Sequence, residues 1–80
     1  MADTKERVIK IIADHLGQDA SNITETTDIA NDLGADSLDL ADLIITFEEE
    51  FNINIDESEA QNLTTVGDVI KQVDKAIGGQ

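Results

Sequence analysis

The segment that decides the fold is residues 36–51, which read DSLDLADLIITFEEEF. Asp36 and, three residues later, Asp39 have the form of a capping box at the start of a helix. With about 100° between successive helical residues, the large apolar side chains fall on one side. This core-forming stripe consists of Leu40, Leu43, Ile44, Phe47 and Phe51. The pattern predicts an amphipathic helix that is capped by Asp36 and reaches Phe51.

The same helix carries a second apolar strip on its other side, about 150–180° from the core stripe. Leu38, Ala41 and Ile45 make up this second apolar strip. Acidic residues flank it: Asp39, Asp42, Glu48 and Glu49. In one interpretation, Leu38 tucks under the preceding loop and Ile45 is a lone exposed apolar residue. In the other, the strip is a hydrophobic anchor ringed by carboxylates that docks onto a basic partner.

Capping patterns outside this segment mark three more helices. Each pairs a capping residue with an acidic residue three positions later: Asp3 with Glu6, Asp56 with Glu59, and Thr65 with Asp68. We expect helices from about Thr4 to Leu16, near Ser58 to Asn62, and from Val66 to Gly78-Gly79, with residues 78–80 as a frayed tail. Gly17 suits the left-handed stop of the first helix.

The connections complete an all-α expectation. Phe51 to Ile55 alternates in polarity but is short and has no partner segment, so we expect an extended connection there. Residues 17–35 form a long connection, in which Ile23, Ile29 and Leu33 can reach the core and residues 28–33 can form a helical turn. The sequence predicts one domain over residues 1–80, a small bundle of three main helices and one short helix.

Charge narrows the possible partners. The 80 residues hold 18 Asp plus Glu against 5 Lys plus Arg, a formal net charge of −13. Such a chain is repelled by nucleic acid and by anionic membrane surfaces. The basic residues all lie near the two ends: Lys5, Arg7, Lys10, Lys71 and Lys75. The acidic middle is either a solubilising surface or a docking face for basic proteins.

The expected location follows from two features that the sequence lacks. No segment reaches membrane-spanning length, and the charged N-terminus does not resemble a signal peptide. We expect a cytoplasmic monomer that does not insert into membranes. The absence of cysteine excludes disulfides, thiolate zinc sites and a cysteine nucleophile.

Two function classes fail on spacing. A calcium loop that starts at Asp28 would have Ala30, Leu33 and Asp39 at its third, sixth and twelfth positions, which does not match the required ligands and glycine. A serine hydrolase motif around Ser37 lacks its glycines, and the sole histidine, His15, fits a structural role near the end of the first helix. We expect no intrinsic catalysis and no specific metal site.

Ser37 occupies a chemically distinctive position. Because Asp36 is the better N-cap, Ser37 is expected to be the first helical residue, with its hydroxyl free and facing solvent. Backbone N–H groups and the helix dipole at this point favour a phosphate ester. From the chemistry alone, an ordinary surface serine or an alternative cap remains the other interpretation.

Residues 33–39, Leu-Gly-Ala-Asp-Ser-Leu-Asp, followed by Leu43 and by residues 48–51, Glu-Glu-Glu-Phe, resemble the prosthetic-group region of acyl carrier proteins. Similar segments occur along nearly the whole chain: residues 7–12, Leu16-Gly17, residues 53–57 and residues 63–66. The resemblance implies a non-catalytic carrier of the type II, dissociated kind. It implies that a phosphopantetheinyl transferase attaches 4′-phosphopantetheine from coenzyme A to Ser37, and that Asp36 helps the transferase place Mg²⁺. The thiol of the arm would carry acyl groups as thioesters.

The resemblance also assigns surfaces. It makes the second helix the docking helix for basic-surfaced synthesis enzymes, through Asp36, Leu38, Asp39, Ala41, Asp42, Ile45, Glu48 and Glu49. It places the lining of an acyl cavity at Ile9, Leu43, Ile44, Phe47 and Leu63.

The pathway is less defined than the carrier class. Leu40 stands where the commonest bacterial and plastid members have Thr, Asp42 where they have Glu, and Asp56 where many have Pro. We expect a carrier of growing chains in fatty acid synthesis, with a specialised polyketide or lipid pathway as the alternative. An acidic interaction module without a prosthetic group is the remaining alternative outside the carrier class.

Overall fold

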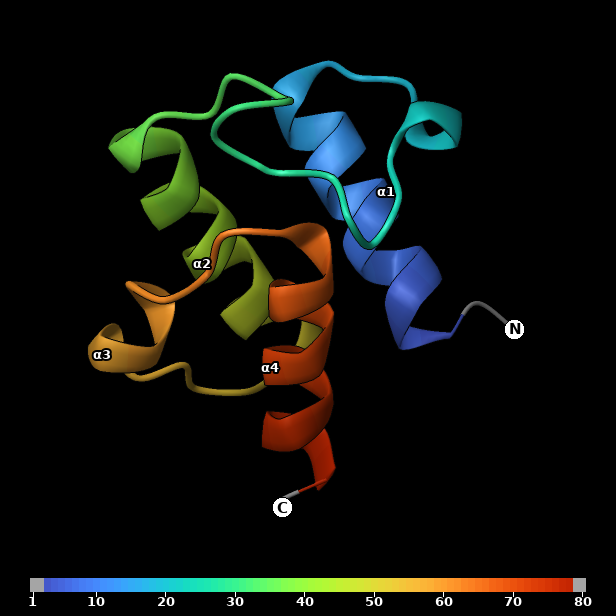
Figure 1. Ribbon diagram of the computed structural model, residues 1–80. Helices are drawn as coiled ribbons and strands as arrows, with labels where there is room; N and C mark the ends of the chain where they lie inside the picture. The colour runs from blue at the N-terminus through green and yellow to red at the C-terminus, as the bar shows by residue number, and fades with distance from the viewer. Residues whose placement is uncertain (1–2, 79–80) are drawn as a thin grey trace.

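The computed structural model describes residues 3–78, and Figure 1 shows their arrangement. The elements are α1 (Thr4–Leu16), the 3-10 helix η1 (Ala20–Asn22), α2 (Ser37–Phe51), α3 (Glu57–Ala60) and α4 (Val66–Gly78). The predicted all-α bundle of three main helices and one short one is confirmed. Within the described part of the chain, β pairing is limited to a single bridge between Asp28 and Thr65. None of the helices found there has the length and apolarity needed to cross a membrane.

The long helices begin and end as their sequences predict. The Asp3 carboxylate accepts a hydrogen bond from Glu6 N–H over 2.9 Å at the start of α1, and Gly17 ends this helix with φ 66°. At the start of α4, Asp68 N–H donates to Thr65 Oγ1 and Thr65 N–H donates to Asp68 Oδ2. Gly78 is the last residue of α4, and the rest of the expected frayed tail lies outside the described residues.

The short helix α3 differs from its prediction. It covers Glu57–Ala60, about one residue earlier and shorter than expected, and the predicted capping box of Asp56 with Glu59 is wrong. Asp56 makes no side-chain capping bond. The carboxylate of Glu59, which would accept the return bond from Asp56 N–H in such a box, accepts hydrogen bonds from Gln72 and Lys75 on α4 instead. A long-range contact has displaced a local one.

The connection between α1 and α2 makes several hydrogen bonds within itself. Asp32 and Leu33 both donate their N–H groups to the carbonyl of Asp28, which forms the predicted helical turn. The helix η1 was not predicted. It starts where the carboxylate of Asp19 accepts hydrogen bonds from the backbone and hydroxyl of Ser21.

This connection also packs against the core and against the start of α4. Ile23 and Ile29 are buried and Leu33 packs partly buried beside them, as predicted. Figure 1 shows the segment crossing from α1 towards α4 and back to the start of α2. Three backbone hydrogen bonds fasten it to residues 64–67: Ile29 N–H to Thr64 O, Val66 N–H to Thr27 O, and Gly67 N–H to Glu25 O.

The core lies between α1, α2 and α4. Its largest fully buried side chains are Val8, Ile12, Ile29, Leu43, Phe47, Val66, Val69 and Val73. The predicted core stripe of α2 faces it, with Leu43 and Phe47 buried and Leu40, Ile44 and Phe51 partly buried. The residues after α2 form the expected extended connection, in which Ile53 and Ile55 are buried. Packing this stripe inward turns the other side of α2 to solvent.

Candidate functional site

Ser37 is the first residue of α2, and its side chain is exposed. The capping box forms as predicted: Asp39 N–H donates to Asp36 Oδ1 over 2.9 Å, and Asp36 N–H donates to Asp39 Oδ2 over 3.2 Å. The two carboxylates therefore serve the helix end. The hydroxyl of Ser37 makes no hydrogen bond to any of residues 3–78. The site therefore exposes to solvent a primary hydroxyl that has no hydrogen-bond partner within residues 3–78.

The start of α2 suits an anion attached to that hydroxyl. The N–H groups of Ser37 and Leu38 lie in the first turn, where a helix supplies no internal acceptor. The positive end of the helix dipole adds to their attraction for a phosphate group. Asp36 and Asp39 oppose this attraction in part, since both carry negative charge nearby. The residues present thus fit a phosphodiester on the Ser37 oxygen.

The second apolar strip lies in the open. Leu38 is 76% exposed and Ile45 is 53% exposed, and Ala41 between them is exposed as well. Leu38 does not tuck under the preceding loop, so that interpretation is wrong. Two large aliphatic side chains remain uncovered on one face of α2, Leu38 directly after Ser37 and Ile45 about two turns further along.

The acidic residues around the strip fall into two groups. Asp39 serves the capping box, and Oε2 of Glu48 accepts a hydrogen bond from Ile55 N–H over 2.9 Å. Glu48 therefore ties the end of α2 to the extended connection that follows it. Asp42 and Glu49 are exposed, and within residues 3–78 their carboxylates have no hydrogen-bond or ion-pair partner. These two charges are the ones available to a visiting protein.

A surface groove of about 490 Å³ runs beside Ser37, between α2 and α3. We call it the Ser37 groove. Its wall on α2 is largely apolar and comes from Leu40, Ala41 and Ile44. Across from them lie Glu57, Ala60, Gln61 and Leu63, in and just after α3. A chain attached to Ser37 can therefore lie along an aliphatic surface without leaving the protein.

The residues predicted to line a cavity lie in different places. Ile44 and Leu63 line the Ser37 groove. Leu43 and Phe47 lie in the packed core, each 1% exposed, and Ile9 packs partly buried against the core from α1. The contribution of α3, through Ala60 and Gln61, was missed. The apolar pair Ala60 and Leu63, one helical turn apart, was the available signal.

The remaining candidate chemistry is sparse. His15 lies exposed in the last turn of α1, where a basic side chain faces the negative end of the helix dipole. Across residues 3–78, no three His, Cys, Asp or Glu side chains are gathered closely enough to hold a metal ion.

Comparisons with known proteins agree with this geometry. The sequence matches the family model of the phosphopantetheine attachment site over residues 6–73. A candidate acyl carrier protein from Mycobacterium tuberculosis is 40% identical, with a TM-score of 0.87 over 91% of this chain and 97% of that chain. The acyl carrier protein of Thermotoga maritima is 30% identical, with a TM-score of 0.79 over 91% of this chain and 85% of that chain. That of Enterococcus faecalis is 29% identical, with a TM-score of 0.79 over 91% and 92% of the two chains.

The family model covers most of the chain, and the matched structures share its helical bundle over nearly their full length. The prosthetic group of this family is phosphopantetheine. The chain therefore belongs to the family of proteins with a phosphopantetheine attachment site and has the fold of the acyl carrier proteins.

Proposed function

We propose that Ser37 is the attachment point of the 4′-phosphopantetheine arm. The observation that carries this proposal is the free, exposed hydroxyl of Ser37 at the start of α2, on the edge of the Ser37 groove. The arm supplies a terminal thiol, which a chain without cysteine cannot provide itself. The helix end beside Ser37 favours the phosphodiester, and the adjoining aliphatic wall gives an attached chain a place to lie.

The modifying enzyme would be a phosphopantetheinyl transferase that uses coenzyme A and Mg²⁺. Asp36 is adjacent to Ser37 and exposed, with Oδ1 accepting the hydrogen bond from Asp39 N–H. A carboxylate has several lone pairs, so Asp36 can cap the helix and still offer an oxygen to Mg²⁺ held by the transferase. In this proposal the chain is a substrate of the transferase and catalyses nothing itself.

The function that best fits these features is that of a type II carrier of growing acyl chains in fatty acid synthesis. Partner enzymes with basic surfaces would recognise the second apolar strip together with Asp42 and Glu49. Leu38 and Ile45 supply the apolar contact, while the two unpartnered carboxylates steer a basic partner towards it.

The attachment is tested by mass. After incubation with a broad-range phosphopantetheinyl transferase, Mg²⁺ and coenzyme A, we expect the intact mass to rise by one phosphopantetheine, and Ser37→Ala to abolish the rise. Ser58→Ala is the matched control, because Ser58 also is an exposed serine near a helix start, directly after an acidic residue. An unchanged mass of the unaltered protein, or modification of Ser37→Ala, would refute the proposal.

A specialised polyketide or lipid pathway is the second candidate. Leu40, which departs from the usual Thr, lines the Ser37 groove and makes its wall more apolar. The intact mass of the protein purified from its own cells gives the elemental composition of the attached chain. The mass of a saturated chain without additional oxygen would support fatty acid synthesis, and the mass of a multiply oxygenated chain would support the second candidate.

A further inference from the structure

Apolar packing holds the helix α3 only in part: Ala60 within it and Leu63 after it pack partly buried against the core. The helix buries none of its residues, and no residue between Ile55 and Val66 is buried. The Ser37 groove lies on one side of it. On the other side, between α3 and α4, is a second hollow of about 240 Å³, lined among others by Glu59, Lys71 and Lys75. Leu63 lines both. A four-residue helix therefore stands as a thin wall between two hollows.

Most hydrogen bonds of this wall are local. The N–H groups of Ala60 and Gln61 donate to Asp56 O and Glu57 O, over 2.8 and 3.1 Å. Asn62 donates its side chain to Ser58 O and its N–H to Glu59 O. Such bonds shape the helical turn but do not fix it relative to α2 or α4.

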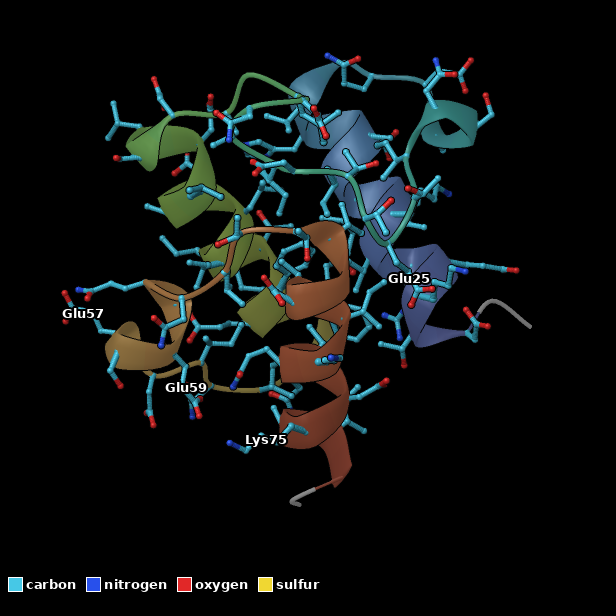
Figure 2. The ribbon with its side chains drawn as sticks, in the orientation of Figure 1. Glu25, Glu57, Glu59 and Lys75 are labelled. Carbon is cyan, nitrogen blue, oxygen red and sulfur yellow. The ribbon has the colours of Figure 1, made fainter. Side chains whose placement is uncertain are left out.

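Glu59 is the exception. Its carboxylate accepts hydrogen bonds from Gln72 and from Nζ of Lys75, the latter over 3.0 Å as an ion pair. Figure 2 shows Glu59 and Lys75 extending between α3 and α4, and Glu57 on the side of α3 away from α4. The Lys75 ammonium group, with the Gln72 amide, holds the pKa of Glu59 below its ordinary value, so the carboxylate stays ionised at neutral pH. The side chain of Glu59 is 33% exposed and that of Lys75 is 72% exposed.

We propose that Glu59 is a positioning residue for the Ser37 groove, because its bonds to Gln72 and Lys75 hold α3 in place as the outer wall. When these bonds break, α3 can swing from α2 and widen the groove, while Ile55 and Val66 anchor its two ends. The part of this inference that concerns an acyl chain in the groove rests on the proposed function. The part that concerns the placement of α3 is independent of the proposed function.

The first experiment measures amide hydrogen exchange of the protein without its prosthetic group. We expect Glu59→Ala and Lys75→Met to speed exchange at Ala60 and Gln61 by about two- to fivefold, the range of one exposed ion pair. Ala is the better helix former, so faster exchange in Glu59→Ala cannot come from lost helix propensity. Lys71→Met is the matched control: it removes the same charge one turn earlier in α4, from a lysine that has no ion pair within residues 3–78. Unchanged exchange in α3, or an equal increase in α1, would overturn the proposal.

The second experiment uses the modified protein loaded with either an octanoyl or an acetyl group. Hydroxylamine cleaves the thioester and reports how well the protein shelters it. We expect Glu59→Ala and Lys75→Met to speed cleavage of the octanoyl thioester by about two- to fivefold and to leave the acetyl thioester unchanged, because only the longer chain reaches along the groove. An unchanged octanoyl rate would overturn the positioning role.

The two experiments separate the possible failures. If the transferase does not modify Ser37, the proposed function fails, while exchange at α3 still decides whether Glu59 places the wall. If the protein is modified and α3 does not loosen in the two variants, the positioning role fails and the carrier function stands.

Discussion

Individual carboxylates of this chain divide into those that accept backbone hydrogen bonds and those that do not. Asp36, Asp39, Glu48 and Asp68 each accept at least one N–H group. The capping positions among them were predictable, because a capping box depends on residues three apart in sequence. The role of Glu48 was not, because Ile55 lies beyond the end of α2 and nothing local indicates that the chain turns back.

The carboxylate of Asp68 gives a pH prediction. Hydrogen bonds from the N–H groups of Thr65 and then Thr64 lower the pKa of Asp68. Because the pKa of Asp68 is lower in the folded than in the unfolded protein, its hydrogen bonds stabilise the fold fully at a pH above the unfolded-state pKa, about 3.9. This stabilisation is lost as the pH falls through the folded-state pKa. We therefore expect Asp68→Asn to lower the free energy of unfolding at pH 7, with the difference from the unaltered protein shrinking below about pH 4.

Urea unfolding between pH 3 and pH 7 measures this difference. Asp74→Asn is the control, since Asp74 is exposed on the same helix and its carboxylate has no hydrogen-bond partner within residues 3–78. A difference between Asp68→Asn and the unaltered protein that stays constant down to pH 3 would contradict the assignment.

Among the helices, α2 shows most clearly what a sequence can and cannot predict. Its cap follows from residues three apart, and its core stripe and the place of the second apolar strip follow from helical periodicity. The exposure of Leu38 did not follow, since the sequence also allowed it to tuck under the preceding loop. The Ser37 groove does not follow either, because its second wall is α3, and α3 takes its place through Glu59 and the α4 side chains. The sequence pattern of α2 cannot predict a groove whose other wall is formed by a segment distant in the sequence.

The division of the α2 carboxylates predicts distinct effects of substitution. We expect Asp42→Lys with Glu49→Lys to lower kcat/KM of the transferase about tenfold at low salt, the low end of electrostatic steering effects, without lowering the thermal midpoint, because neither carboxylate has a partner to lose within residues 3–78. Glu48→Gln should instead lower the thermal midpoint, because the bond to Ile55 N–H weakens. Transferase kinetics and calorimetry on the same samples check both. Full transferase activity of the double variant at low salt would remove these residues from the docking surface.

Arg7 on α1 makes two polar contacts with the end of α2. Arg7 Nη2 donates to Glu50 O over 3.1 Å, and its guanidinium carbon lies 4.3 Å from the centroid of the Phe51 ring. Exposed cation–π contacts contribute about 0.5–1 kcal/mol and hydrogen bonds about as much. We expect Arg7→Met to lower the free energy of unfolding by about 1 kcal/mol.

Lys10→Met is the control for Arg7→Met, because it removes the same charge from the next turn of α1. Chemical denaturation measures both variants. Equal losses would assign the effect to net charge and not to the contact with Phe51.

The whole molecule carries many more acidic than basic side chains, so most of its negative charge is not neutralised. Its formal net charge is −13, and residues 3–78 contain two ion pairs, Lys5 with Glu25 at 3.5 Å and Lys75 with Glu59 at 3.0 Å. Self-repulsion of this kind weakens a compact state and is screened by salt. The net charge could be predicted from the composition. The small number of ion pairs could not, because it depends on which side chains the fold brings together.

We expect added salt to raise the thermal midpoint. Because no three acidic or histidine side chains within residues 3–78 are placed to hold a metal, NaCl should reproduce most of the effect of MgCl₂ at matched ionic strength. Scanning calorimetry in the two salts checks this. A much larger shift with MgCl₂ would indicate that carboxylates rearrange around the ion.

The three backbone bonds between residues 25–29 and residues 64–67 bear on how the chain folds as it is synthesised. These bonds close a loop of some forty residues, which costs chain entropy. They can form only after both segments have been synthesised. Ile29 cannot complete its hydrogen bonding, and α1 cannot cover its apolar side, before the start of α4 has left the ribosome. The nascent chain must therefore keep part of its aliphatic stripes in contact with water or a chaperone until residues 64–67 have left the ribosome, and the charge of −13 would help to keep it dispersed during that interval.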